Sequence, residues 1–195
     1  MNLALFDFDG TITKKDSLPD FLRFTFPLAV LVRGIGSQVF WLAGYKAGFV
    51  STQHAKEKLL SRFFRNLSEE KFKTFGETYA HEGLPRIIRK SALAKIREHL
   101  QNGDRVVVVS ASVAQVVGPF AREIGVEFLS TVMEVRDGLL TGKFLGDNCT
   151  GAEKVRRIKE AYDLQEYTAL YAYGDSAGDR EMLSLANFQF VDQFK

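Results

Sequence analysis

The amino-acid sequence predicts an α/β fold in which a parallel β-sheet lies between layers of helices, with an all-helical segment inserted after the first strand. Short apolar runs at residues 3–6, 106–109 and 168–173 each end at acidic or hydroxyl residues, which is typical of buried parallel strands. Amphipathic stretches alternate with the later runs, as expected for right-handed strand–helix–strand units. Residues 15–85 lack such runs, and so they are expected to form the helical insertion.

Length and composition bound the class of protein. The 195 residues suffice for one domain with an insertion, and 46% hydrophobic with 26% charged residues argues for a folded core. A net charge of +2 gives no reason to expect binding to nucleic acid. The single cysteine, Cys149, excludes an internal disulfide, and the first strand begins too early for a signal peptide, so a cytoplasmic location is expected.

The first strand, residues 3–6, leads directly into two acidic residues. Asp7 and Asp9 follow it on the carboxyl edge of the sheet, where open α/β sheets bind ligands, and Gly10 marks a turn. Alternation of side chains is expected to bring both carboxylates to one side. Two like charges so close require a neutralising cation or a shared proton, which indicates chemistry; the alternative is a plain strand end with an Asx turn.

The helical insertion carries recognisable start and stop signals. Helices are expected to begin near Ser17, at Ser51 or Thr52, and at Ser68, each a favourable N-cap residue, and 83–85 is expected to close the region. Residues 24–50 are strongly apolar, but their longest charge-free piece, 34–45, is shorter than the roughly 20 residues of a membrane span.

The second half of the chain repeats the alternation of helices and strands. A helix over 113–124 is expected to be broken or kinked at its Gly-Pro pair, 118–119. An Asp-Gly turn at 137–138 predicts a β-hairpin. The other expected elements are helices at 87–100, 151–162 and 180–186 and strands at 126–129 and 188–191.

Four segments in order resemble the motifs of haloacid dehalogenase-type phosphatases: Asp7-x-Asp9-Gly10-Thr11, Ser110, Lys154, and Gly174-Asp175-x3-Asp179. The insertion is similar to the cap of the subfamily that contains phosphoserine phosphatase. The stretch 148–154 and the apolar start of the cap are similar to a bacterial branch with phosphatidylglycerophosphatase-like members. The resemblance implies a Rossmann-like three-layer α/β/α core over 1–14 and 86–195 and a helical cap over 15–85.

The chemistry expected of these residues is hydrolysis of a phosphomonoester. Asp7, nearest the strand, is the expected nucleophile and would form an aspartyl-phosphate. Asp9 is expected to protonate the leaving oxygen and then to activate water, and Thr11 to orient Asp9 by a hydrogen bond. The resemblance supports both aspartate roles.

An all-oxygen site for Mg²⁺ is expected from Asp7, Asp175 and the backbone carbonyl of Asp9, with Asp179 acting indirectly or through water. Ser110, Lys154 and backbone N–H groups, including that of Ala111, are expected to bind the phosphate. Phosphate, Asp7 and Asp175 carry a formal charge of about −4 against about +3 from Mg²⁺ and Lys154, so Asp9 is expected to start protonated.

Substrate choice is expected to reside in the cap. Asp16 falls where phosphoserine phosphatases carry the acid that meets the substrate amine. Their cap arginine has no exact counterpart, and Arg62 is the candidate for its role; this departure argues against phosphoserine as the substrate. The histidines at 54, 81 and 99 lack metal-ligand spacing and are expected at the surface.

Three functions remain open at this point. The first is a phosphatase for a small soluble phosphomonoester. The second is a phospholipid-headgroup phosphatase that contacts an anionic membrane, such as the inner membrane, because residues 21–66 hold seven Lys and Arg against one acid. The third is a phospho-acceptor signalling domain resembling response-regulator receivers, against which the acid at Asp9 weighs.

Overall fold

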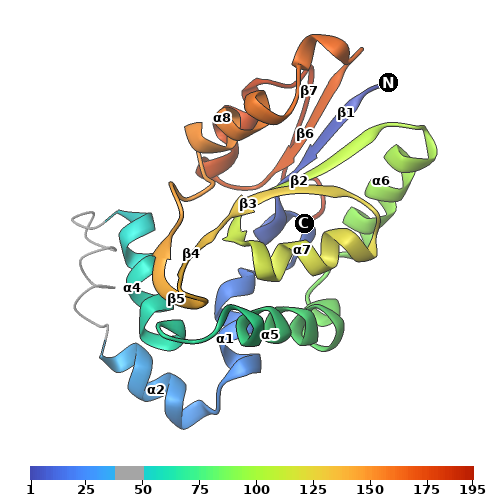
Figure 1. Cartoon of the computed structure of the whole chain (residues 1–195). Helices are drawn as coiled ribbons and strands as arrows, with labels where there is room; N and C mark the ends of the chain where they lie inside the picture. The colour runs from blue at the N-terminus through green and yellow to red at the C-terminus, as the bar shows by residue number, and fades with distance from the viewer. Residues whose placement is uncertain (38–50) are drawn as a thin grey trace.

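The computed structural model describes residues 1–37 and 51–195, and it has the predicted α/β architecture (Figure 1). Five strands form a parallel sheet in the order β3-β2-β1-β6-β7. Their bounds are β1 Leu3–Phe6, β2 Arg105–Val113, β3 Glu127–Thr131, β6 Leu170–Gly174 and β7 Phe188–Val191. Phe6 lies beside Val108 and Tyr173, so the three central strands end at the same edge of the sheet.

Helices cover both faces of the sheet and make a three-layer arrangement. Ala4 and Phe6 of β1 pack in the cluster that includes α6 Lys90–Gln101 and α7 Ala114–Glu123. Leu3 and Leu5 pack in the opposite cluster, with α8 Ala152–Ala161 and α9 Arg180–Ser184. All four side chains are fully buried, which explains why β1 is a continuous apolar run without alternation.

The insertion contains helices on the carboxyl side of the sheet (Figure 1). Those described are α1 Ser17–Thr25, α2 Leu28–Gly36, α4 Thr52–Phe64 and α5 Glu69–Glu82, followed by a short 3-10 turn at Leu84–Arg86. The expected starts at 51 and 68 are confirmed, because the Ser51 and Ser68 hydroxyls accept from the N–H groups of His54 and Lys71. Part of the expected apolar stretch, residues 38–50, lies outside the described residues.

The insertion shares a hydrophobic core with the sheet. Buried rings of α1, α4 and α5 meet one another, with Phe21 stacked on Phe64 at 5.6 Å and tilted against Tyr79 at 5.3 Å between ring centroids. The same cluster continues through Ile12 and Phe8 to Phe6 of β1. Among the helices of the described residues, none combines the length and apolar character needed to cross a bilayer.

A break or a kink was expected at residues 118–119; the break is wrong, since α7 continues through Pro119. Pro119 has no N–H for the carbonyl of Gln115, one turn earlier. Gly76 of α5 lies against that carbonyl so closely that an added Cβ would stand 2.0 Å from its oxygen. The carbonyl that Pro119 leaves without its usual helical partner thus packs against α5. This contact also joins the inserted helices to α7, which covers the sheet.

The predicted hairpin forms from β4 Met133–Arg136 and β5 Leu139–Phe144, and it is a separate two-stranded sheet that is not hydrogen-bonded to the five-stranded one. It lies against α4 and the turn that follows it (Figure 1), where Leu140 accepts from the N–H of Asn66 and donates to the carbonyl of Leu67. A two-stranded hairpin needs such support, because alone it buries too little apolar surface. The hairpin therefore belongs spatially with the inserted helices.

Candidate active site

The turn after β1 positions the first acidic pair. Residues Phe8–Ile12 form a single wide π turn, in which Gly10 adopts a φ of +83°. A Cβ at Gly10 would lie 2.1 Å from Oδ2 of Asp175, so glycine is required both by the backbone conformation and by this approach. The turn thereby brings the loop after β1 against the loop after β6.

Lys154, in the first turn of α8, points into the sheet edge and is 1% exposed. Its Nζ donates to Oδ1 of Asp7 at 2.6 Å, to Oδ1 of Asp179 at 2.7 Å and to the carbonyl of Val109 at 2.7 Å. Burial by itself lowers the pKa of this ammonium group, but the two carboxylates outweigh burial and raise the pKa above its ordinary value. Lys154 is therefore a fixed positive charge beside Asp7.

Three acidic residues from distant parts of the sequence converge at this point. Ligand oxygens of Asp7, Asp175 and Asp179 lie within 4.8 Å of one another. Burial raises the pKa of Asp7 to about 7, with Lys154 opposing the rise, and burial also raises the pKa of Asp175. A cluster of buried and half-buried carboxylate oxygens is a donor set that suits a hard divalent cation, which would favour their charged form.

Asp179 also stabilises the loop between β6 and α9. Its Oδ2 accepts from the N–H of Asp175 at 3.3 Å and from the N–H and hydroxyl of Ser176 at 3.0 and 2.8 Å. Burial alone raises the pKa of Asp179, but Lys154 and these hydrogen bonds outweigh burial and lower it. With both oxygens engaged, Asp179 fits the expected indirect role better than that of a direct ligand.

Asp9 lies in the π turn, and its side chain has a separate set of partners. Its Oδ2 accepts from the Ser112 hydroxyl at 2.5 Å and its Oδ1 from the N–H of Ser17 at 2.7 Å. Burial raises the pKa of Asp9 and nearby Asp16 raises it further, while these hydrogen bonds oppose the rise. The environment therefore favours the protonated acid that proton donation requires.

The expectation for Thr11 is wrong. Ser112 and Ser17 orient Asp9, whereas the buried Oγ1 of Thr11 has no hydrogen-bond partner in the part of the chain that the structure describes. The π turn carries Thr11 past Asp9, so closeness in sequence does not bring the two side chains together. Ser112 lies two residues after Ser110, and in an extended chain side chains at this spacing point the same way. This spacing could have indicated that Ser112 also faces the site.

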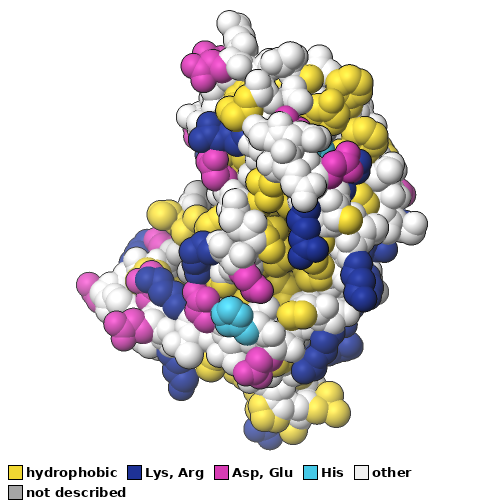
Figure 2. Space-filling model, turned by 90° about the vertical axis from the view of Figure 1, so that its right-hand side faces the viewer, with side chains coloured by type: hydrophobic (Ala, Val, Ile, Leu, Met, Phe, Trp, Pro, Cys, Tyr) yellow, Lys and Arg dark blue, Asp and Glu magenta, His cyan; other side chains and the backbone are white. Residues whose placement is uncertain are grey.

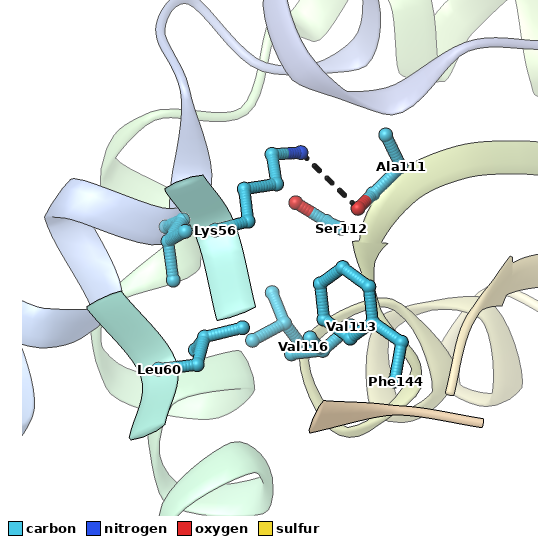
Figure 3. A pocket seen from close by; sticks show the side chains of 8 residues that line it. Lys56, Leu60, Ala111, Ser112, Val113, Val116 and Phe144 are labelled. Atoms are coloured by element: carbon cyan, nitrogen blue, oxygen red, sulfur yellow. Dashed lines mark hydrogen bonds between the residues drawn. The ribbon is translucent and has the colours of Figure 1, made fainter. Parts of the chain in front are cut away.

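Two of the expected phosphate-binding residues, Ser110 and Ala111, lie towards the carboxyl end of β2. Ser110 is fully buried, follows Val109 directly, and its hydroxyl accepts from the N–H of Ser112 at 2.9 Å. Ala111 turns its carbonyl towards Lys56 of α4, whose Nζ donates at 3.3 Å (Figure 3). The role expected for the Ala111 N–H stays a prediction.

The two expected cap residues are not brought together. Asp16 is exposed and caps α1 by accepting from the N–H of Leu18 at 3.0 Å. Arg62 is exposed and donates to the hydroxyl of Ser37, the C-cap residue of α2, at 3.3 Å. Lys56 was not predicted as a site residue, but its side chain extends to the carbonyl of Ala111 at the end of β2. Lys56 lies one helical turn before the buried Leu60, on the same face of α4.

Comparison with known proteins agrees with the fold. The family model for haloacid dehalogenase-like hydrolases matches residues 4–184, and the chain belongs to this family. It is therefore a haloacid dehalogenase-like hydrolase.

Among its relatives, protein CicA of Caulobacter vibrioides is 31% identical over 193 residues, which cover 95% of this chain and 83% of CicA. A probable phosphatase of Mycobacterium tuberculosis is 30% identical over 189 residues, which cover 92% of this chain and 64% of that protein. A Bordetella pertussis protein of unknown function has a solved structure with a TM-score of 0.82 and 25% identity over 99% of both chains. A substrate-bound phosphoserine phosphatase shares the fold, with a TM-score of 0.68 and 21% identity over 97% of this chain and 85% of the other.

Proposed function

We propose that this hydrolase is a phosphatase, which hydrolyses a small phosphomonoester with Mg²⁺ through an aspartyl-phosphate on Asp7. The observation that carries the proposal is the contact between Asp7 and the buried Lys154, beside Asp175 at the carboxyl end of β1. A nucleophilic carboxylate, a cation site and a fixed positive charge are the groups that phosphoryl transfer to an aspartate needs. Membership of a hydrolase family favours this enzyme over a receiver-like signalling domain.

The proposed metal site consists of the carboxylates of Asp7 and Asp175 and the backbone carbonyl of Asp9, with Asp179 acting indirectly. All of these donors are oxygens, which Mg²⁺ prefers. Mg²⁺ bound there would neutralise charge between the nucleophile and the phosphoryl group. The burial that raises the pKa of Asp7 supports this assignment, since a nearby cation favours the nucleophilic carboxylate form.

The proposed reaction has two steps. An oxygen of Asp7 forms a bond to phosphorus while the ester P–O bond breaks, and the proton of Asp9 passes to the leaving oxygen. Water then attacks phosphorus, Asp9 takes a proton from that water, and inorganic phosphate leaves with the Asp7 carboxylate restored. Ser110, the Ala111 N–H and Lys154 would hold the phosphoryl oxygens, and Ser112 and Ser17 would hold Asp9 in place.

Other proteins support these roles by analogy. One solved structure of the same fold, with a TM-score of 0.66 and 22% identity over 96% of this chain, is described as a phospho-aspartyl intermediate analogue of phosphoserine phosphatase. We also propose that residues 15–85 form the cap of a core made of 1–14 and 86–195. The pairing of Thr13 with Ile88, where the chain leaves and re-enters the core, supports these boundaries.

Removal of divalent cations is expected to abolish hydrolysis of p-nitrophenyl phosphate, and added Mg²⁺ is expected to restore it. Mg²⁺ alone is also expected to raise the melting temperature, because binding to the folded state stabilises it. The Asp175→Asn variant should lose most of both effects, whereas Asp163→Asn, an exposed change remote from the cluster, should keep them. Full turnover in excess chelator, with no Mg²⁺-dependent shift in melting temperature, would reject the metal site.

A second candidate function, a phospholipid-headgroup phosphatase at a membrane surface, is favoured by α2. Leu28 and Val32 are 75% and 65% exposed. Hydrophobic side chains gather at the lower end of the molecule, where α2 lies (Figure 2). An exposed apolar helix with neighbouring Lys and Arg residues suits an anionic bilayer surface.

Under this second candidate, the protein is expected to float with vesicles that contain anionic lipid and not with neutral vesicles. The double variant Leu28→Glu/Val32→Glu should lose the binding, because charge replaces the apolar face. The control Leu145→Glu makes the same kind of change at a side chain that is 63% exposed, in the loop directly after β5. Equal recovery of wild type and double variant with anionic vesicles would reject a role for α2.

A further inference from the structure

We propose that the inserted helices carry a binding site for one fatty acid, a methylene chain that ends in a carboxylate. The site is the apolar groove that α1, α2 and α4 form together, and Arg23, which lines it, is assigned to the carboxylate. The inference goes beyond the proposed function and does not depend on it, because none of the groove residues belongs to the candidate active site.

The groove lies around α2, at the end of the insertion that points away from the sheet (Figure 1). Apart from Pro19 and Arg23, its lining is aliphatic and consists of Leu22, Leu28, Leu31, Val32, Ile35 and Leu59. Leu22 and Leu31 are buried, whereas Leu28, Val32 and Ile35 are exposed. A chain lying in the groove would therefore remove exposed apolar side chains from water, which favours binding.

The size of the groove suits a chain of about ten carbons. Its volume is about 460 Å³, about fifteen times the roughly 30 Å³ that one water molecule takes up in the liquid. A methylene group is of similar size to a water molecule, so ten of them fit with room for a carboxylate. The volume also falls within the range of roughly 300–1,000 Å³ of small-molecule sites.

Arg23 supplies a positive charge that is not compensated within the protein. Among the described residues, no side chain forms an ion pair or a hydrogen bond with its guanidinium group. The acid closest to it along α1, Asp20, is paired with Lys15 and accepts from the Tyr79 hydroxyl at 3.1 Å. A guanidinium group beside apolar surface offers two parallel N–H donors, the arrangement that binds a carboxylate.

The chemistry of the lining favours a fatty acid over a peptide segment. Of the described residues that line the groove, Arg23 alone has a polar side chain, and it offers only donors. An extended peptide laid into the groove would bring backbone N–H and C=O groups, most of which would lose water without gaining a partner. A methylene chain has no such groups, and its single charged end matches the single charge of the groove.

Isothermal titration calorimetry with decanoate, in the absence of any phosphate ester and below the concentration at which decanoate forms micelles, tests the inference. One decanoate is expected to bind per protein chain. The neutral 1-decanol should bind about tenfold more weakly, since it lacks the charge-assisted hydrogen bonds to Arg23. Butyrate, which has the carboxylate without the long chain, should show no binding at the same concentrations.

Two exposed substitutions separate the two parts of the site. Arg23→Met should lower the affinity for decanoate to that for 1-decanol and leave 1-decanol unchanged, and Arg23→Lys should retain part of the difference. Val32→Glu should weaken both ligands, because a carboxylate enters the apolar lining. The matched controls are Arg97→Met on the exposed side of α6 and Leu145→Glu, a side chain 63% exposed against 65% for Val32. Both controls should bind like the wild type.

Decanoate is also expected to raise the melting temperature of the wild type and not that of Val32→Glu, because only a ligand of the folded state stabilises it. Absence of decanoate binding to the wild type, or an affinity that Arg23→Met and Val32→Glu leave unchanged, would overturn the inference. Binding to anionic vesicles without binding of decanoate would overturn it in favour of a bilayer-facing α2. A dimer in sedimentation that Val32→Glu dissociates would overturn it in favour of a second copy of the chain in the groove.

Discussion

Replacement of Asp7 by asparagine is expected to lower the turnover of p-nitrophenyl phosphate by about 10³-fold or more. The amide has nearly the shape of the carboxylate but lacks its charge and nucleophilicity, so no aspartyl-phosphate forms. The fold should persist, because Lys154 keeps Asp179 and the carbonyl of Val109 as hydrogen-bond acceptors. Steady-state kinetics, together with circular dichroism and a melting curve, measure both results.

The matched control is Asp137→Asn, the same change at the exposed tip of the β4–β5 hairpin. Asp137 has a φ of +51°, a conformation that asparagine also tolerates. The control should retain wild-type activity. Comparable activity in Asp7→Asn would remove Asp7 from the role of nucleophile.

The variant Asp9→Asn is expected to accumulate a covalent phosphoenzyme when p-nitrophenyl phosphate is the substrate. Its good leaving group needs little help from an acid, so the first step proceeds. The second step should slow by about 10²- to 10⁴-fold, because an amide cannot take a proton from water. An asparagine oxygen can still accept from Ser112 or Ser17, which limits structural disturbance. A burst of p-nitrophenol near one equivalent per enzyme, followed by slow turnover, is the expected observation.

The raised pKa of Asp9 adds a pH dependence to this role. An alkyl phosphate needs the protonated acid, so its kcat/KM should fall as pH rises through the pKa of Asp9. That decrease should be absent in Asp9→Asn. Unimpaired steady-state turnover of alkyl phosphates by the variant would contradict the acid–base role.

Local sequence signals predicted much of the fold. The apolar run of β1 was recognisable because both of its faces are buried, and Ser51 and Ser68 were recognisable because capping acts within one helical turn. The continuation of α7 through Pro119 could not be recognised from the sequence, because Gly76, which packs closely against it, lies about forty residues earlier.

Buried polar residues show the same limit. His99 was expected at the surface but is 5% exposed, and its ring nitrogens contact Asp104 at 2.8 Å and Tyr173 at 2.9 Å. Asp104 is nearby in sequence, whereas Tyr173 comes from a distant strand. Partners of this kind satisfy a buried imidazole, and only the fold brings them together.

The candidate site divides in a similar way. Asp7, Asp175 and Asp179 were predictable as a group, because they follow strands that end at one edge of a parallel sheet. Lys154 was assigned to this group only through the resemblance to the phosphatase motifs, and the structure places it against Asp7. The hydrogen-bond partners of Asp9 could not be predicted, since Ser17 and Ser112 come close to its carboxylate only because the π turn redirects the chain. Lys56 likewise depends on how α4 packs against the end of β2.

Mapping the phosphorylated residue in Asp9→Asn tests the central proposal most directly. The protein is mixed with p-nitrophenyl phosphate and Mg²⁺, quenched in acid within the burst, and digested for peptide mass spectrometry. We expect one phosphate on the peptide that contains Asp7, released by hydroxylamine as an acyl phosphate. A stable phosphate ester on a serine or threonine, or turnover without any labelled peptide, would contradict a phosphoryl group carried by Asp7.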